Sequence, residues 1–378
     1  MDWFDGFRLG CFVFAALFHG AIWGGLIKTW LRERRVTKGE GSTPLVSVIV
    51  PVHNEAACLP ALLESLEKQD YPAVEYVFID DRSADGSGAI ISRFMGGRAR
   101  LLTLRENPGA NRKQYALDRG IEEAAGELLL FIDGDCEAPP SWIRTMVSRM
   151  ADRATGLCLG PVFKKGGERG FLPLYQCFDH AVRYLYLAAS AGLDAAGGGF
   201  GNNLILRREA LDAIGGYGRL PPSATEDAAL IAGIRRGSGY HVRAVCDSGA
   251  AVMTRQEPSW KRLVNQTLRW NNGGLFSPDW TTRINFTILM LIIASGVVTV
   301  PFLPFCPGLW VFPAMVLFGM TLNTIAALRL FGASMPRAGA AYILQVLFIP
   351  CYFTFLTALG FLGVKAGWEG TGHLANGD

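Results

Sequence analysis

The segment that decides the fold is GELLLFIDGD, residues 126–135. Leu128 to Asp133 is predicted to be a strand buried on both faces, because apolar residues follow one another without alternation. The strand ends in two carboxylates, Asp133 and Asp135, separated by Gly134. Ligands of open α/β sheets bind at the carboxyl ends of strands, and two such acids can hold a divalent cation beside a ligand's phosphates. The alternative is an ordinary turn, since Asp and Gly are common after strands.

Strand and helix signals alternate on both sides of this segment. Such alternation indicates right-handed βαβ units, so we expect the α/β class with a Rossmann-like, mostly parallel sheet. The other predicted strands are 45–52, 74–79, 100–104, 156–163 and 203–207. The predicted helices are 55–69, 83–94, 111–125, 141–150, 171–191, 226–236 and 259–272.

The composition favours a membrane protein. Half of the 378 residues are hydrophobic, and the mean hydropathy of +0.24 is high for a soluble chain. The net charge is only +3 and the basic residues are scattered, which argues against a nucleic-acid partner. The eight cysteines form no CxxC pair, so we expect reduced thiols in a protein that faces the cytosol.

Four apolar stretches are long enough to cross a bilayer, at 7–27 and near 284–305, 309–331 and 339–364. The first lacks the preceding positive charge of a signal peptide, so we expect an uncleaved anchor. The basic cluster from Lys28 to Lys38 places the following domain in the cytoplasm, and Arg329 and Arg337 flank the loop predicted to return there. We therefore expect an integral protein of a bacterial-type inner or plasma membrane. Its expected parts are an anchor with a basic linker (1–44), an α/β domain (45–256), an interfacial amphipathic segment (257–281) and three further spans (282–378).

Five motifs occur in a characteristic order. They are VSVIVPVHNEAACLPALLESLEKQDYP (46–72), EYVFIDDRSADGS (75–87), FIDGD (131–135), TED (225–227) and QTLRW (266–270). Together they resemble the membrane-bound family 2 glycosyltransferases with a GT-A fold, which include cellulose, hyaluronan and poly-N-acetylglucosamine synthases and ceramide glucosyltransferases. The resemblance covers about residues 46–270. It implies a nucleotide-sugar donor, expected to be a UDP-sugar, and Mg²⁺ or Mn²⁺ as cofactor.

The resemblance also implies which residues meet the donor. Nucleotide-sugar contacts are expected from Glu55, Asp80, Asp81, Lys113 and Asp133, and metal ligation from Asp133 and Asp135. The metal would neutralise charge on the departing nucleoside diphosphate. Alternatively, Asp80 and Asp81 cap the helix predicted to begin near Ser83, a role worth about 1 kcal/mol. Arg82 stands where the family usually has glycine, which leaves the contacts to the base open.

Sugar transfer needs a base, because the acceptor hydroxyl must lose its proton as the new bond forms. Asp227 of the TED motif is the candidate, with Glu226 next in line; the alternative is a helix-terminal acid favoured by the dipole. One base without a nucleophile motif implies a single, inverting displacement. Gln266, Arg269 and Trp270 match QxxRW and are expected at the diphosphate and the acceptor, unless this helix is only an interfacial anchor.

Three functions remain open at this point. The favoured one is transfer of one sugar to a membrane lipid at the cytoplasmic leaflet, since four spans are few for a polymer channel. The second is a processive polysaccharide synthase, which TED and QxxRW also suit. The third is an inactive nucleotide-sugar-binding scaffold. The presence of every expected acid argues against this function. A Rossmann dehydrogenase is disfavoured because no GxGxxG follows the first strand.

Overall fold

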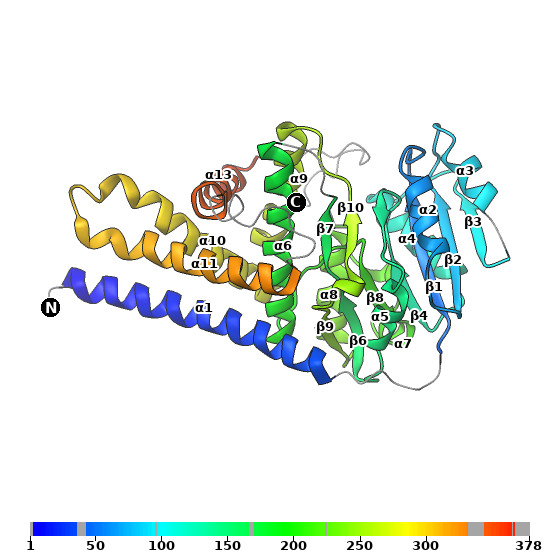
Figure 1. The fold of residues 1–378 in the computed structure, drawn as a ribbon, viewed down its shortest axis with the longest axis horizontal. Coiled ribbons are helices and arrows are strands. Elements are labelled where there is room, and N and C mark those ends of the chain that lie inside the picture. The colour runs from blue at the N-terminus through cyan, green and yellow to red at the C-terminus, as the bar shows by residue number, and fades with distance from the viewer. Residues whose placement is uncertain are drawn as a thin grey trace. The chain divides into compact units, whose positions relative to one another are not determined.

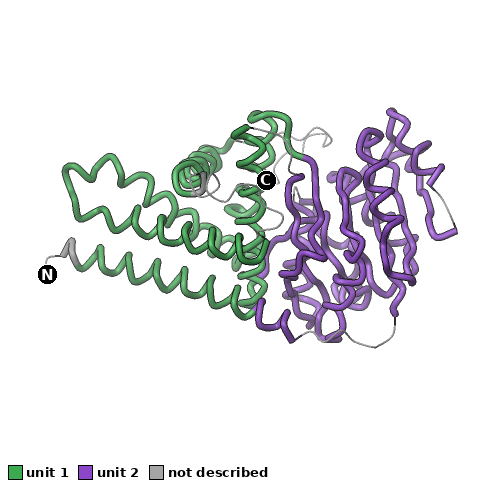
Figure 2. Tube along the Cα trace, viewed as in Figure 1, with its two compact units in different colours: residues 1–28, 166–195, 256–367 green, residues 29–165, 196–255, 368–378 purple. Residues whose placement is uncertain are grey.

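The structure is a computed structural model that describes residues 3–35, 43–94, 97–165, 170–223, 225–331, 344–364 and 366. The chain divides into two compact units, shown in Figure 2. Unit 1 comprises residues 1–28, 166–195 and 256–367, and unit 2 comprises residues 29–165, 196–255 and 368–378. Both units are discontinuous in sequence, and residues 166–195 join the membrane-type helices rather than the α/β part of the chain.

Unit 2 is built on a seven-stranded sheet with the order β3-β2-β1-β4-β8-β6-β9. Strand β1 pairs in parallel with β2 and β4, as their adjacent positions in Figure 1 also show. Strand β8 runs antiparallel to both of its neighbours. The predicted α/β fold with a mostly parallel sheet is therefore confirmed. The strands are β1 (Val46–Val52), β2 (Val74–Asp80), β3 (Ala99–Thr103), β4 (Leu128–Phe131), β6 (Thr155–Leu159), β8 (Leu204–Arg207) and β9 (His241–Ala244).

The helices of unit 2 pack on this sheet through apolar faces. Helix α4 lies against β1 and β2. A Cβ on its Gly120 would come within 2.4 Å of Ile79, so glycine permits this close approach. All residues of β2 and β4 are buried, which explains the continuous apolar sequence of β4. The helices are α2 (Leu59–Glu67), α3 (Ser87–Phe94), α4 (Arg112–Glu123), α5 (Trp142–Ser148), α7 (Arg208–Asp212) and α8 (Glu226–Gly237).

The single strand predicted over 156–163 is wrong, because the structure has two strands there. Strand β6 ends at Leu159, and β7 (Val162–Lys164) joins a separate three-stranded sheet with the order β5-β10-β7. The break falls at Gly160 and Pro161, where proline lacks the amide that a continuing ladder needs. Strands β5 (Cys136–Glu137) and β10 (Val252–Thr254) complete this small sheet, which begins directly after the second acid of the DxD motif.

Unit 1 consists of helices around an apolar core. It contains most of α1 (Trp3–Arg35), together with α6 (Phe171–Gly192), α9 (Trp260–Leu275), α10 (Trp280–Val298), α11 (Val311–Phe331) and α13 (Ile349–Phe361). The predicted helices 171–191 and 259–272 are thus confirmed within a few residues. The core includes Tyr175, Leu263, Leu268, Met290, Ile293, Met320 and Leu356.

Within the described ranges, three helices are long and apolar enough to cross a membrane: Gly6–Arg35, Trp280–Phe302 and Pro307–Phe331. Many of their apolar side chains are exposed, among them Leu17 at 68% and Phe318 at 61%. These helices are compatible with membrane anchoring. The apolar helix Val346–Phe361 is shorter, and the start of the predicted span 339–364 lies outside the described residues, as do Lys38 and Arg337.

Candidate functional site

Acidic residues gather at one edge of the unit 2 sheet. Because β1, β2 and β4 are parallel and in register, their carboxyl ends meet at that edge. Glu55 follows β1, Asp80 ends β2, and Asp133 and Asp135 follow β4. Gly134 lacks the Cβ that would lie 3.1 Å from Glu55 Cγ, so the bare backbone lets Glu55 approach the DxD turn. Burial, together with the charge of Asp135, raises the pKa of Glu55 to about 7.

Lys113 joins two of the acids. Its Nζ lies 2.7 Å from Asp133 Oδ1 and 2.8 Å from Oδ2, and 3.6 Å from Glu226 Oε1. Burial alone would lower the pKa of Lys113, but Asp133 and Glu226 outweigh it and raise that pKa. The lysine therefore stays charged, and its positive charge compensates the negative charge of Asp133. Residue Glu226, which the sequence suggested only as a substitute base, is 8% exposed and serves here as an ion partner.

Asp135 has a different environment from Asp133. Its Oδ2 accepts a hydrogen bond from Thr254 Oγ1 at 3.0 Å, and its side chain is partly exposed. Thr254 lies on β10 and was missed by sequence reasoning, because a threonine 119 positions away gives no local signal. The neighbouring Cys136 is buried, and burial raises the pKa of its thiol well above the usual value, so it is a packing residue rather than a nucleophile.

The donor set fits a cation that is shared with a ligand. Among the described residues, no group of three or more His, Cys, Asp or Glu side chains could hold a metal ion by itself. Mg²⁺ is commonly held by one or two carboxylates and completes its shell with substrate phosphates and water. Asp135 and Asp133 can supply those carboxylates. Asp133 pairs with the charged Lys113 through both oxygens, whereas Asp135 accepts from the uncharged Thr254 hydroxyl and Cys136 thiol, so Asp135 is the more available ligand of the two.

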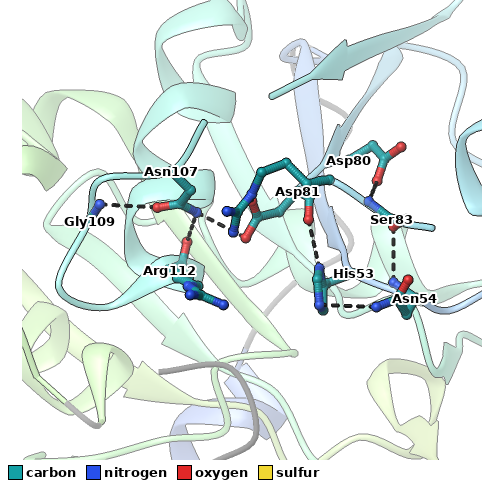
Figure 3. Close-up of polar contacts among 9 residues, drawn as sticks. His53, Asn54, Asp80, Asp81, Ser83, Asn107, Gly109 and Arg112 are labelled. Carbon is teal, nitrogen blue, oxygen red and sulfur yellow. Dashed lines mark hydrogen bonds and ion pairs between the residues drawn. The ribbon is translucent and has the colours of Figure 1, made fainter. Parts of the chain in front are cut away.

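The loops after β1 and β2 interlock through hydrogen bonds (Figure 3). His53 Nδ1 donates to the carbonyl oxygen of Asp81 at 2.6 Å, and the amide of Asn54 donates to Ser83 Oγ at 3.0 Å. Asp80 Oδ1 accepts from the Ser83 amide at 3.0 Å. These bonds fasten the two loops to each other at the sheet edge.

Asp81 is almost fully buried and has a partner on each oxygen. Arg82 Nε donates to Oδ1 at 2.8 Å and Asn107 Nδ2 donates to Oδ2 at 2.9 Å. Arg82 adopts a φ of 58°, in the left-handed region, which costs a residue other than glycine about 1–2 kcal/mol. The alternative that Asp80 and Asp81 cap the next helix is wrong: α3 begins at Ser87, whose amide donates to Asp85.

Asp227 lies in the first turn of α8, as predicted. Its Oδ1 accepts from the amide of Ala228 at 2.8 Å, and the side chain is partly exposed. The charge of Asp227 also contributes to the raised pKa of Lys113, after those of Asp133 and Glu226. Acids of the TED motif and of the DxD motif thus both raise the pKa of Lys113. The catalytic role of Asp227 stays a prediction.

The QxxRW motif lies on α9 in unit 1, and the one helix contains Gln266, Arg269 and Trp270. Gln266 Nε2 donates to Glu257 Oε1 at 2.8 Å. Gln176 of α6 brackets the backbone of Glu257, accepting from its amide at 2.7 Å and donating to its carbonyl at 3.0 Å. The glutamine of the motif therefore connects α9 to α6; its predicted contact with the diphosphate stays a prediction.

A buried ion pair on α6 faces the tryptophan of this motif. Arg183 Nε lies 2.7 Å from Asp179 Oδ2, with side-chain exposures of 12% and 2%. The guanidinium of Arg183 lies 5.2 Å from the ring centroid of Trp270 and 4.7 Å from that of Phe353. Such cation–π geometry fixes the ring, so the pair positions Trp270. The sequence singled out Arg183 only as a polar residue in an aromatic helix.

Comparisons with known proteins identify relatives of part of this chain. Residues 47–215 match the sequence model of Glycosyl transferase family 2. The chain is 34% identical over 121 residues to Glycosyltransferase AglE of Haloferax volcanii, covering 32% of this chain and 40% of that one. It is 37% identical over 112 residues to an undecaprenyl-phosphate 4-deoxy-4-formamido-L-arabinose transferase of Aeromonas hydrophila, covering 27% and 32%. The chain thus spans less than half the length of these relatives.

A solved structure shares the fold. The mannosyltransferase PcManGT of Pyrobaculum calidifontis, in complex with GDP-Man and Mn²⁺, superposes with a TM-score of 0.54 and 18% identity over 94% of this chain and 99% of that one. Its likeness supports the GT-A architecture of sheet and helices. The match over residues 47–215, which include the DxD acids and Lys113, identifies that part of the chain as glycosyltransferase family 2, and the likeness to the solved structure shows that the chain has the GT-A fold.

Proposed function

We propose that this protein transfers a sugar from a nucleotide-sugar donor to a membrane lipid, with inversion at the sugar carbon. The observation that supports it most is the charge imbalance at the sheet edge. Asp133 and Glu226 share Lys113, while Asp135, Asp227 and Glu55 lie beside them and Arg255 acts on Glu55. Surplus carboxylates at this edge suit a site that receives a cation with its diphosphate ligand.

The donor would bind along the strand ends. Glu55, Asp80, Asp81, Lys113 and Asp133 are the proposed nucleotide-sugar contacts, and Asp135 with Asp133 would hold Mg²⁺ or Mn²⁺. The cation neutralises charge on the leaving nucleoside diphosphate when it is bound. The mannosyltransferase of similar fold was solved with GDP-Man and Mn²⁺, which supports the class of donor and cofactor without distinguishing a UDP-sugar from a GDP-sugar.

Asp227 is the proposed base. As the acceptor oxygen forms its bond to the sugar carbon, the bond from that carbon to the diphosphate oxygen breaks, and the acceptor proton passes to the Asp227 carboxylate. The leaving group departs as the nucleoside diphosphate. Because one displacement occurs, the product has the configuration opposite to that of the donor. Gln266, Arg269 and Trp270 would serve the diphosphate and the acceptor.

The lipid acceptor is proposed from the chain's apolar helices. In the described part of the chain, three of them are long and apolar enough to cross a membrane. Lys28, Arg32, Arg34 and Arg35 lie near the end of the first, which favours a cytoplasmic catalytic unit. The Aeromonas hydrophila relative is named for transfer to undecaprenyl phosphate, a lipid, and this supports a lipid acceptor here. The QTLRW motif on α9 supports the second candidate, a processive polysaccharide synthase.

The full-length protein in nanodiscs, supplied with total lipid extract and a panel of UDP- and GDP-sugars, tests the proposal. We expect one donor to yield a lipid-linked single sugar, detected by mass spectrometry, with transfer lost in EDTA and restored by Mn²⁺. A water-soluble polymer as product would favour the synthase instead. Donor binding without any transfer product in the presence of the complete lipid extract would contradict both.

A further inference from the structure

Unit 2 contains a cavity of about 460 Å³ between the last turns of α1, the end of α5, and strands β6 and β9. Its lining includes Arg32, Glu33 and Arg35 of α1, Arg149 after α5, and Arg243 of β9. None of the acids at the sheet edge lines it. The volume falls within the range of small-molecule sites.

The wall of the cavity is held by a buried network. Arg149 Nε lies 2.7 Å from Glu33 Oε1, with side-chain exposures of 13% and 12%. Glu33 Oε2 accepts from the amide of Cys246 at 3.1 Å, and Arg149 also pairs with Asp247 at 3.0 Å. The end of α1 is therefore fastened to α5 and to the loop after β9. The cavity keeps its shape because its wall is fixed by these bonds.

The charge of the lining favours an anion. Four arginines stand against two carboxylates, Glu33 and Asp152, so the formal charge is +2. Asp247, which pairs with Arg149, lowers the sum to +1. The carbonyl end of α1 contributes only about half a negative charge. The sum over the lining residues and Asp247 stays positive, and the planar forks of arginine match the geometry of phosphate oxygens.

The place of the cavity along the chain favours a lipid as the source of the phosphate. Arg32 and Arg35 belong to the last turn of the apolar helix Gly6–Arg35, where a membrane helix leaves the hydrocarbon and meets the headgroups. Basic pockets next to membrane helices bind anionic lipid headgroups. We propose that this cavity binds the phosphate of an anionic phospholipid headgroup, with a soluble phosphate ion as the other source of the same chemistry.

Lipid binding to the full-length protein in nanodiscs tests this proposal without any measurement of sugar transfer. Nanodiscs of phosphatidylcholine alone, of phosphatidylcholine with phosphatidylglycerol, and of phosphatidylcholine with added inorganic phosphate separate the two sources. We expect phosphatidylglycerol to co-purify in native mass spectra and to raise the unfolding temperature. Each arginine near a membrane surface contributes about five-fold to binding, so Arg32→Gln with Arg243→Gln should weaken retention of phosphatidylglycerol about 25-fold.

The matched control is Arg119→Gln, which removes an exposed arginine of α4 that pairs with Glu122 outside the cavity. It should retain phosphatidylglycerol as the wild type does. If the double variant fails to fold, Arg35→Gln alone, in the exposed last turn of α1, should still lose about five-fold. Phosphate that raises the unfolding temperature of the wild type but not of the cavity variants, without a phosphatidylglycerol effect, would make a soluble phosphate the ligand. Equal retention by cavity variants and control, with no phosphate effect, overturns the proposal.

Discussion

Two charged clusters, one in each unit, differ in charge balance and in exposure to solvent. At the sheet edge of unit 2, Lys113 faces Asp133 and Glu226, and the lysine and Asp133 side chains are 21% and 29% exposed. In unit 1, Asp179 and Arg183 form a balanced pair with exposures of 2% and 12%, closed in by the rings of Trp270 and Phe353. The first cluster has surplus negative charge and access to solvent. The second has neither.

The difference separates a site that receives a charged ligand from a pair that positions a ring. Desolvating an ion pair costs several kcal/mol per ion, so a closed, balanced pair keeps its stability only while both partners are present. An open, unbalanced cluster gains from a cation that arrives later. The clusters should therefore respond differently to mutation and to metal.

The largest expected effect is on transfer itself, at Asp135. Asp135→Ala should abolish sugar transfer while the protein still folds, because this acid is partly exposed and its side-chain partners, the Thr254 hydroxyl and the Cys136 thiol, are uncharged. Transfer assays with and without EDTA measure the effect. Asp212→Ala, an exposed acid of α7, is the control and should keep full activity. Undiminished transfer by the wild type in chelator would remove the metal from the mechanism.

Asp227→Asn should reduce the transfer rate by at least about 10²-fold, since general-base catalysis contributes about 10²–10⁴-fold. The base acts on the acceptor, so donor affinity should stay within a few-fold of the wild type. Single-turnover kinetics and donor titration separate the two quantities. A near-normal rate would mean that Asp227 is only a helix-terminal acid, and Glu226 would be the next residue to test.

Arg183→Met should lower the free energy of unfolding by about 3–5 kcal/mol, because it leaves the Asp179 carboxylate buried without its partner. Added Mn²⁺ should not restore the loss, since the pair is closed to solvent. The double variant Asp179→Leu with Arg183→Met should recover most of the stability, which thermal unfolding would show. Recovery by Mn²⁺ would mean that unit 1 also contains an open ionic site.

Lys113→Met should cost less, on the order of 1–2 kcal/mol, because Asp133 remains partly exposed. Here Mn²⁺ or Mg²⁺ should raise the unfolding temperature more than in the wild type, since the cation can replace the lost charge. Lys68→Ala, which removes an exposed pair with Glu64, is the control and should show no metal response. An equal metal response in both variants would contradict the surplus-charge explanation.

Part of this site could be predicted because its signals are local. The apolar run of β4 and the pair Asp133 and Asp135 lie within ten residues, and parallel pairing then places them beside the ends of β1 and β2. Helix α9 was predicted from its own amphipathic periodicity. The boundary between β6 and β7 was missed because apolar residues continue across Gly160 and Pro161.

The sequence by itself determined the alternation of strands and helices, the order of the motifs and the apolar spans, since each depends on residues close together in the chain. Only the tertiary structure decided that Thr254 holds Asp135, that Lys113 joins Asp133 to Glu226, and that Arg183 faces Trp270. These partners are 20 to 119 positions apart in their hydrogen bonds and ion pairs. Folding brings them together through packing of whole elements, and no local pattern in the sequence encodes which polar side chains then meet.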